Sequence, residues 1–338
     1  MEKVTIKKIA ELAGVSVSAV SFVLNNKKGV SEETRQRVLK IIEELDYTPN
    51  VNSRRLILQR SFNLIVCLDD RISTIDNFFY TEILSAIISK GEKLGYSIVL
   101  SKSSSEDIRA RFEQNLSQRN ADGIIFMQDI SERMQKSIEG YGIPYIVVDS
   151  HDTASSYHSI TSDAENASYT ATKYLVDCGH RKVAYIGMNR IPSFYFNTFS
   201  GYKRAMEELD LPVQMDWIQA DAFDEESAMK CMERILESKS RPTAVFCASD
   251  IFAIGAMKAV TEAGCRIPED VSFIGMDDIV LSRYCSPALT TMHIDKYKMG
   301  KMAVEILDNM INGNEVALKN QISFDQLIER ETVCKLVH

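Results

Sequence analysis

Near the N-terminus, two short segments carry apolar residues at helical spacing and polar residues between them. A glycine separates the two segments. The apolar positions are Ile9, Ala13, Val15, Val20 and Val23. Ala10 is small enough to let two helices approach closely, and Gly14 can adopt the positive φ that a tight turn needs. This spacing predicts two helices that cross around a turn, which is a helix-turn-helix.

The outward positions of this motif determine its chemistry. Residues near the N-terminus of the second helix of such a motif reach base edges in the major groove, so we expect DNA as the ligand. Val17 and Phe22 suit apolar contact with thymine methyl groups, although packing within the head is the alternative for Phe22. Hydroxyl and amide groups suit phosphates and base edges and complete the expected DNA-contact set: Thr5, Ser16, Ser18, Ser21 and Asn25.

A third helix should hold this pair together. Ser31 is suited to cap its first turn, and the next two residues, Glu32 and Glu33, are carboxylates that favour the positive end of the helix dipole. The apolar residues expected to form the core of the head from this helix are Val38, Leu39, Ile41, Ile42 and Leu45. Pro49 then stops the helix, so we place a head at residues 1–46 and a hinge or linker at 47–60.

Charge is distributed unevenly along the 338 residues. Residues 1–60 contain 11 Lys and Arg against 7 Asp and Glu, whereas the whole chain carries a net charge of −8. A basic head on an acidic body is expected when only the head meets phosphates. No apolar run approaches a membrane span and the start lacks a secretory signal, so we expect a cytoplasmic protein without membrane contact.

Catalytic and metal-binding motifs are missing from the sequence. It contains no Walker loop, no GxGxxG after a first strand, no GxSxG elbow and no His/Cys cluster with metal spacing. The seven cysteines are scattered and include no CxxC pair, which favours reduced thiols. We therefore expect neither an enzyme nor a bound cofactor or metal.

The head contains the stretches Ile9-Ala10, Ala13-Gly14-Val15-Ser16, Val20-Ser21, Val23-Leu24-Asn25, Val30-Ser31 and Tyr47-x-Pro49-Asn50. In these stretches it resembles the lac repressor (LacI/GalR) family of bacterial transcription regulators. The resemblance implies that residues 50–56 form a short helix when two copies meet on DNA, with Leu56 wedged into the minor groove. By the same likeness Asn50, Ser53 and Arg54 join the expected DNA-contact residues. Many members carry Arg at the position of Phe22, so the preferred half-site should differ.

Beyond residue 61 the pattern changes to apolar strands alternating with amphipathic helices. The expected strands lie at 64–68, 97–100, 123–127 and 145–148, and the alternation restarts at 182–187, 244–247 and 271–275. Two such runs predict two doubly wound α/β lobes with a ligand cleft between them. The fold class is thus a small all-α helix-turn-helix head on a bilobed α/β body.

The body also resembles this family, which shares its fold with periplasmic sugar-binding proteins. The matching stretches include Asn77-Phe78-Phe79, Ala121-Asp122-Gly123, Gly179-His180-Arg181, Ser249-Asp250 and Asp270-Val271-Ser272. The resemblance implies chain crossings between the lobes near 162, 291 and 323. It therefore assigns residues 61–161 and 292–323 to the first lobe and 162–291 and 324–338 to the second.

Side chains at strand ends and in nearby loops are the candidates for binding an effector. Phe78, Phe79 and Phe223 can stack on a ligand ring, although core packing is the alternative for each. Asp149, Asp250 and Asp277 can accept hydrogen bonds from ligand hydroxyls, the alternative being caps of the next helix. Many members of the family have an arginine at the position of Thr198, and some have a side-chain amide at the position of Met127. These two differences predict a cleft that is less polar than in those members.

These observations favour a dimeric DNA-binding regulator, most simply a repressor, switched by a sugar-like small molecule in the cleft. A pseudo-palindromic operator would require two heads and hence a homodimer. Two alternatives remain open at this point. One is the same regulator under the control of a partner protein, and the other is a ligand carrier on the bilobed fold.

Overall fold

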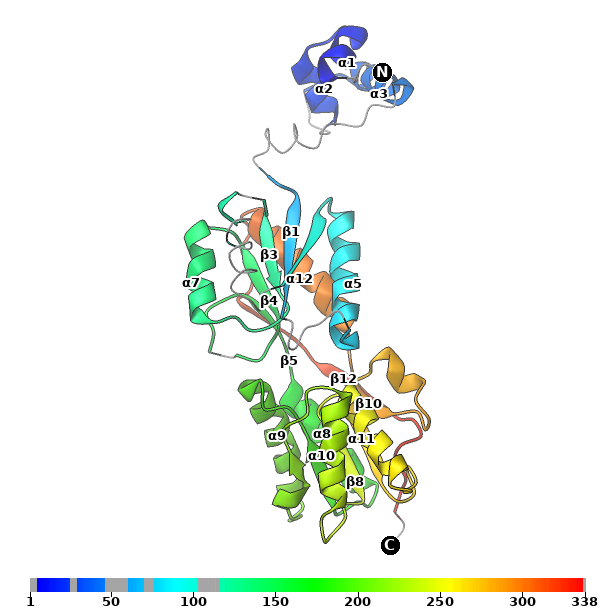
Figure 1. Ribbon diagram of the computed structural model, residues 1–338. Coiled ribbons are helices and arrows are strands. Elements are labelled where there is room, and N and C mark those ends of the chain that lie inside the picture. The colour runs from blue at the N-terminus through cyan, green and yellow to red at the C-terminus, as the bar shows by residue number, and fades with distance from the viewer. Residues whose placement is uncertain are drawn as a thin grey trace. The chain divides into compact units, whose positions relative to one another are not determined.

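The computed structural model describes residues 5–24, 29–45, 60–69, 76–102, 113, 116–118, 120–152 and 154–336. It divides into two compact units, residues 1–62 and 63–338, which we treat separately. Figure 1 traces the chain through both units. No helix in the described ranges is long and apolar enough to cross a lipid bilayer.

The described residues of the first unit form the helices α1 (Ile6–Ala13), α2 (Val17–Leu24) and α3 (Glu32–Glu44). A hydroxyl caps the start of each helix: the amide of Lys8 donates to Thr5, that of Ala19 to Ser16 and that of Thr34 to Ser31, the last as predicted. Gly14 ends α1 with a φ of 64°, as the turn requires. The helix-turn-helix prediction is confirmed in these elements.

A small apolar core joins the three helices of this unit. Its buried members are Ile9, Ala10, Ala13, Val20, Val23 and Val38. Ile41, Ile42 and Leu45 pack against this core and are partly buried. The expectation for Leu39 is wrong, because 42% of this residue is exposed. It falls outside the set at 38, 41, 42 and 45, whose three- and four-residue spacing lies on one helical face.

The second unit is built on two six-stranded sheets. The first has the strand order β11-β5-β4-β3-β1-β2 and the second β12-β10-β9-β8-β6-β7. Every ladder is parallel except the pairing of β10 with β12. The strands of the first sheet are β1 (Asn63–Leu68), β2 (Ser97–Lys102), β3 (Gly123–Phe126), β4 (Tyr145–Ser150), β5 (Ser159–Ser162) and β11 (Lys319–Ile322). Those of the second are β6 (Val183–Ile186), β7 (Ile218–Gln219), β8 (Ala244–Cys247), β9 (Ser272–Asp277), β10 (Thr290–Ile294) and β12 (Phe324–Ile328).

Helices cover both faces of each sheet, as a doubly wound fold requires. The first sheet carries α5 (Phe78–Lys93) and α12 (Lys296–Ile311) on one face and α7 (Glu132–Tyr141) on the other (Figure 1). The second sheet carries α8 (Ala164–Asp177) and α9 (Pro192–Glu207) on one face, and α10 (Glu225–Leu236) and α11 (Asp250–Glu262) on the other. The predicted bilobed α/β architecture is confirmed.

The chain passes between the two sheets three times. The first crossing follows β5, which ends at Ser162 in the first sheet. The second crossing follows β10, which ends at Ile294 in the second sheet, and leads to α12, which packs on the first sheet. A final crossing joins β11 to β12 at residue 323. The middle crossing thus lies three residues beyond the expected position at 291, because β10 stays paired with β9 and β12.

Candidate functional site

The second helix of the head presents one buried and one open face. Val20 and Val23 are buried, whereas Val17 and Phe22 are 41% and 38% exposed. Ser18 is exposed and Ser21 is half-buried. Ser16 lies exposed at the start of α2, where its hydroxyl caps the amide of Ala19. The open face therefore offers apolar and hydroxyl groups to a groove-sized partner.

Phe22 combines exposure with packing inside the head. A methyl group built on Gly29 would lie 3.2 Å from Cε2 of Phe22, so the ring rests on the turn that follows α2. This contact fixes the direction of the ring without covering it. The ring of Phe22 is therefore partly packed within the head and partly exposed. The remaining expected DNA contacts, Asn25, Asn50, Ser53, Arg54 and Leu56, lie outside the described residues.

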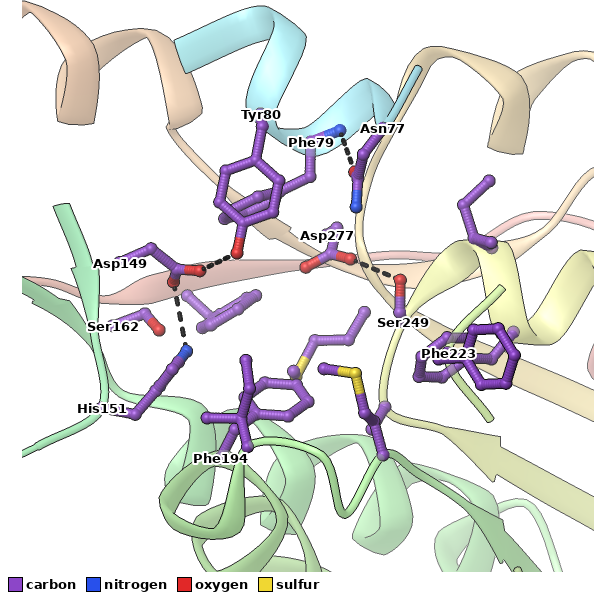
Figure 2. Close-up of a pocket in the computed structure, with 17 residues that line it drawn as sticks. Asn77, Phe79, Tyr80, Asp149, His151, Ser162, Phe194, Phe223, Ser249 and Asp277 are labelled. Atoms are coloured by element: carbon purple, nitrogen blue, oxygen red, sulfur yellow. Dashed lines mark hydrogen bonds and ion pairs between the residues drawn. The ribbon is translucent and has the colours of Figure 1, made fainter. Parts of the chain in front are cut away.

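A cavity lies between the two lobes of the body. Figure 2 shows how side chains from both lobes meet around it. Its lining comprises Asn77, Phe79, Tyr80, Asp149, His151, Ser162, Met188, Ile191, Phe194, Phe223, Ala248, Ser249, Ile251, Phe252, Met276, Asp277 and Phe324. The first lobe thus contributes the N-terminal turn of α5 and the end of β4, and the second contributes the ends of β8 and β9.

Asp149 is the centre of the polar wall from the first lobe. It has a φ of 58° at an irregularity in the pairing of β4 with β5. Tyr80 donates its hydroxyl to Oδ2 of Asp149 at 2.7 Å, and Nε2 of His151 lies 3.4 Å from Oδ1 (Figure 2). Burial alone would raise the pKa of Asp149, but the contacts with His151 and Tyr80 leave it below its ordinary value.

His151 is itself 93% buried beside this carboxylate, with a relative exposure of 7%. Burial lowers the pKa of His151, but the Asp149 carboxylate more than offsets this and the net pKa is raised. Its ring lies 4.9 Å from that of Phe194, a residue of α9 in the second lobe. Among the described residues its Nδ1 has no hydrogen-bond partner. Because Nδ1 is also shielded from solvent, His151 carries a buried polar atom that the described protein groups leave unsatisfied.

Asp277 faces the same cavity from the second lobe. It is the last residue of β9, its φ is 121°, and its Oδ2 accepts a hydrogen bond from Ser249 at 2.9 Å (Figure 2). Burial raises the pKa of Asp277 well above its ordinary value, and repulsion from Asp250 adds to this. A ligand that donates a hydrogen bond here would meet an acceptor that few protein groups satisfy.

Aromatic rings form much of the remaining wall. Phe79 packs edge-on against Tyr80 with ring centroids 5.0 Å apart. Phe223 is 40% exposed, and the guanidinium of Arg190 lies 3.4 Å from its ring centroid. Such rings suit stacking against a flat or partly apolar ligand. Of the residues proposed from the sequence, the structure therefore brings Phe79, Asp149, Phe223 and Asp277 to one cavity.

Three other proposed residues do not line this cavity. Phe78 is 37% exposed at the first position of α5. Thr198 is fully buried in α9, where its hydroxyl bonds with Tyr185 at 2.7 Å and donates to the carbonyl of Phe194 at 2.9 Å. Asp250 is fully buried and accepts hydrogen bonds from non-local groups around the loop after β9. The hydrogen bonds of Thr198 and Asp250 hold the second lobe together.

Sequence reasoning missed several residues of the polar wall, above all Tyr80, His151 and Ser249. Tyr80 and His151 lie one and two residues from the proposed Phe79 and Asp149, respectively. Tyr80 and His151 would have been proposed if the candidates had included every residue within two positions of a strand end or a helix start. Nothing in the local sequence could have shown that Nδ1 of His151 lacks a partner.

Comparison with known proteins gives consistent results over both units. Residues 5–50 match the family described as bacterial regulatory proteins, lacI family, and residues 172–333 match the periplasmic binding protein-like domain. The HTH-type transcriptional repressor PurR of Vibrio vulnificus is 33% identical over 335 residues, which cover 98% of this chain and 99% of the relative. The ribose operon repressor of Haemophilus influenzae is 36% identical over 316 residues, covering 92% and 93%.

Solved structures agree with this assignment. The lac repressor dimer bound to operator and the anti-inducer ONPF aligns with a TM-score of 0.82 at 26% identity, covering 98% of this chain and all of the other. Matching families, relatives and fold thus extend from the head to the end of the body. The chain therefore belongs to the lacI family of bacterial regulatory proteins and is a DNA-binding transcriptional repressor, not an enzyme.

Proposed function

We propose that a small, uncharged, hydroxyl-bearing molecule binds between the two lobes and sets the affinity of this repressor for its operator. One observation carries the proposal: Asp149 and Asp277 come from different sheets and face the same cavity. A ligand that bonds to both carboxylates depends on how the lobes are placed. It therefore favours one lobe arrangement, which is the condition for changing DNA affinity.

The chemistry of the cavity wall narrows the ligand class. Asp149, Asp277 and Ser162 offer oxygen acceptors to hydroxyl groups, and Phe79 and Phe223 offer ring faces. No Lys or Arg is among the residues of the described chain that line this cavity, and the guanidinium of Arg190 lies against the ring of Phe223. An anionic ligand would therefore meet Asp149 and Asp277 with no Lys or Arg in the lining itself. A sugar or a related metabolite with a ring suits this wall. The name of the ribose operon repressor relative is consistent with that class.

In the head, the proposal assigns base contacts to the open face of α2 and phosphate contacts to its flanks. Val17, Ser18 and Phe22 would face the major groove, while Thr5, Ser16, Ser21 and Asn25 would meet the backbone. The hinge residues Asn50, Ser53, Arg54 and Leu56 would contact the minor groove at the centre of the site. Two heads on a pseudo-palindromic operator imply a homodimer, as in the operator-bound lac repressor dimer.

Genomic footprinting with the full-length protein would supply the operator, and genes beside it would suggest metabolites to test. Fluorescence anisotropy with that duplex then measures the operator affinity with and without each compound. We expect one compound to change the affinity about 5- to 150-fold, the usual range of allosteric coupling. The change should be lost in Asp277→Asn and kept in the control Asp210→Asn, which alters an exposed carboxylate. An effect that persists unchanged in Asp277→Asn would contradict the proposed site.

A further inference from the structure

Lys296 is a buried cation at the place where the chain crosses from the second lobe to the first. It is the first residue of α12, two residues after β10 ends, and only 2% of it is exposed. Burying an ammonium group is costly unless hydrogen bonds and an opposite charge compensate it. The partners of this side chain should therefore show what it does.

The ammonium group holds the backbone of the loop that presents Asp277 to the cavity. Nζ donates to the carbonyl oxygen of Asp277 at 2.5 Å and to that of Asp278 at 3.2 Å, with the carbonyl of Ile294 at 3.4 Å. Asp277 and Asp278 both have positive φ, at 121° and 50°. Non-glycine residues rarely adopt such angles, and surrounding contacts must maintain them. Lys296 therefore helps to aim the carboxylate of Asp277.

The same ammonium group also reaches the first lobe. Its Nζ lies 3.4 Å from Oε2 of Glu82 on α5, whose own side chain is 45% exposed. Glu82 follows the turn of α5 that contributes Phe79 and Tyr80 to the cavity. One cation thus joins the loop after β9 in the second lobe to the cavity end of α5 in the first.

Close packing would carry a displacement of Lys296 into α5. Gly300 of α12 lies against the carbonyl of Ile83, where any side-chain carbon would overlap with it. Lys90 of α5 and Glu305 of α12 form an ion pair at 2.6 Å. The two helices are therefore in contact along several turns, and a packed pair of this kind moves as a unit.

We propose that Lys296 is a positioning residue that couples the contact made at Asp277 in the cavity to helix α5 of the first lobe. The inference rests on the proposed function in one respect, namely that Asp277 receives the effector. In this scheme a ligand that engages Asp277 shifts the 277–278 backbone, Lys296 follows its carbonyl partners, and Glu82 transfers the change to α5. The chain then needs no direct ligand contact with Glu82 for the first lobe to respond.

Hydrogen exchange measured by mass spectrometry tests this coupling without any ligand. Asp277→Asn, which replaces the carboxyl group at the cavity with an amide, serves as the perturbation, and the readout is amide exchange in the first turns of α5. In the otherwise unaltered full-length protein we expect exchange there to change about threefold or more, within the range reported for coupling mutations. The change should largely vanish when Asp277→Asn is combined with either Lys296→Met or Glu82→Gln.

Matched variants separate coupling from a merely structural role. Lys298→Met on α12 and Glu92→Gln on α5 alter exposed residues of the same types and should leave the response to Asp277→Asn intact. Glu82→Gln changes a half-exposed side chain, so it decides the question even if Lys296→Met does not fold. A response in α5 of equal size in the Glu82→Gln background, or none in the unaltered background, would overturn the proposal. Neither result bears on whether an effector binds at Asp277, which the operator assay tests.

Discussion

Thr291→Val should destabilise the body because Thr291 donates its hydroxyl to a carboxylate with no exposed surface. Oδ1 of Asp250 accepts this hydrogen bond at 2.5 Å, while Oδ2 accepts from the hydroxyl of Ser282 at 2.6 Å and from the amide of Ile279 at 2.9 Å. The substitution replaces the hydroxyl with a methyl group of similar size. Its effect should therefore report this hydrogen bond together with the longer one, 3.4 Å, that the Thr291 hydroxyl accepts from the amide of Asp278.

The expected size of the effect follows from the charge and burial of the acceptor. Hydrogen bonds to charged groups contribute about 1.5–3 kcal/mol, and a buried acceptor that loses its donor has no water to replace it. We therefore expect Thr291→Val to lower the free energy of unfolding by about 2 kcal/mol. With a urea dependence of about 3 kcal/mol per molar for a unit of this size, the midpoint should fall by roughly 0.7 M.

The destabilisation should also depend on pH in a defined direction. Burial raises the pKa of Asp250, and the hydrogen bonds from Ser282, Thr291 and Ile279 lower it without cancelling the rise. Because the folded-state pKa exceeds the unfolded value, the folded protein loses stability as the pH rises through the folded-state pKa. Thr291→Val removes a donor that favours the charged form. Its cost should therefore be largest above that pKa and shrink as Asp250 becomes protonated.

Urea titrations followed by circular dichroism at several pH values would measure both effects. Thr261→Val is the matched control, because its hydroxyl is exposed and donates only to the carbonyl of Met257 in its own helix. Combining Thr291→Val with Asp250→Asn should reduce the cost of the first substitution, since the charged acceptor is then absent. A change in unfolding free energy below about 0.5 kcal/mol for Thr291→Val would refute the reasoning.

Two further predictions concern the cavity and the head. Because the pKa of His151 is raised in the folded state, its pairing with Asp149 stabilises the fold below about pH 6.5, and this contribution is lost as the pH rises through the folded-state pKa. The unfolding free energies of the wild type and of His151→Gln should therefore converge toward higher pH. Curves of unfolding free energy that stay parallel from about pH 6 to about pH 8.5 would contradict this prediction. In the head, Val20→Ala should cost about 2 kcal/mol of stability by opening the small core, whereas Phe22→Ala should weaken operator binding by about fivefold or more with a smaller loss of stability. Thermal melts measure the loss of stability in each variant, and fluorescence anisotropy measures its operator binding. Equal losses of stability in Val20→Ala and Phe22→Ala would assign Phe22 to packing within the head.

The head was predictable from the sequence because local rules determine most of it. Thr5, Ser16 and Ser31 cap the three helices within three residues of their partners, so each contact is visible in a short window. Gly14 likewise acts only on its own turn. Leu39 escaped these rules because burial depends on which helical face meets the core, and three packed helices cover only a narrow face.

The cavity was only partly predictable because its polar groups depend on distant segments. Asp149 and Asp277 could be proposed since the carboxyl ends of parallel strands meet at one edge of a sheet. Asp250 is also near a strand end, but its carboxylate turns toward Ser282 and Thr291, which are 32 and 41 residues away in sequence. Thr198 similarly bonds to Tyr185 on a neighbouring strand. Such pairings become visible only when the lobe is assembled.

The buried carboxylates of the body differ in how they are compensated, and this difference points to Asp277 as the group that most needs a ligand. Asp149 has His151 and Tyr80, and Asp278 has Arg330 and His293, so the pKa of each is lowered despite burial. Asp250 has three donors. Asp277 accepts from Ser249, while Lys296 donates to its backbone carbonyl and not to its carboxylate. A ligand hydroxyl at Asp277 would therefore add to the partial compensation that Ser249 and the nearby Lys296 ammonium provide, and it would do so at the loop that Lys296 holds.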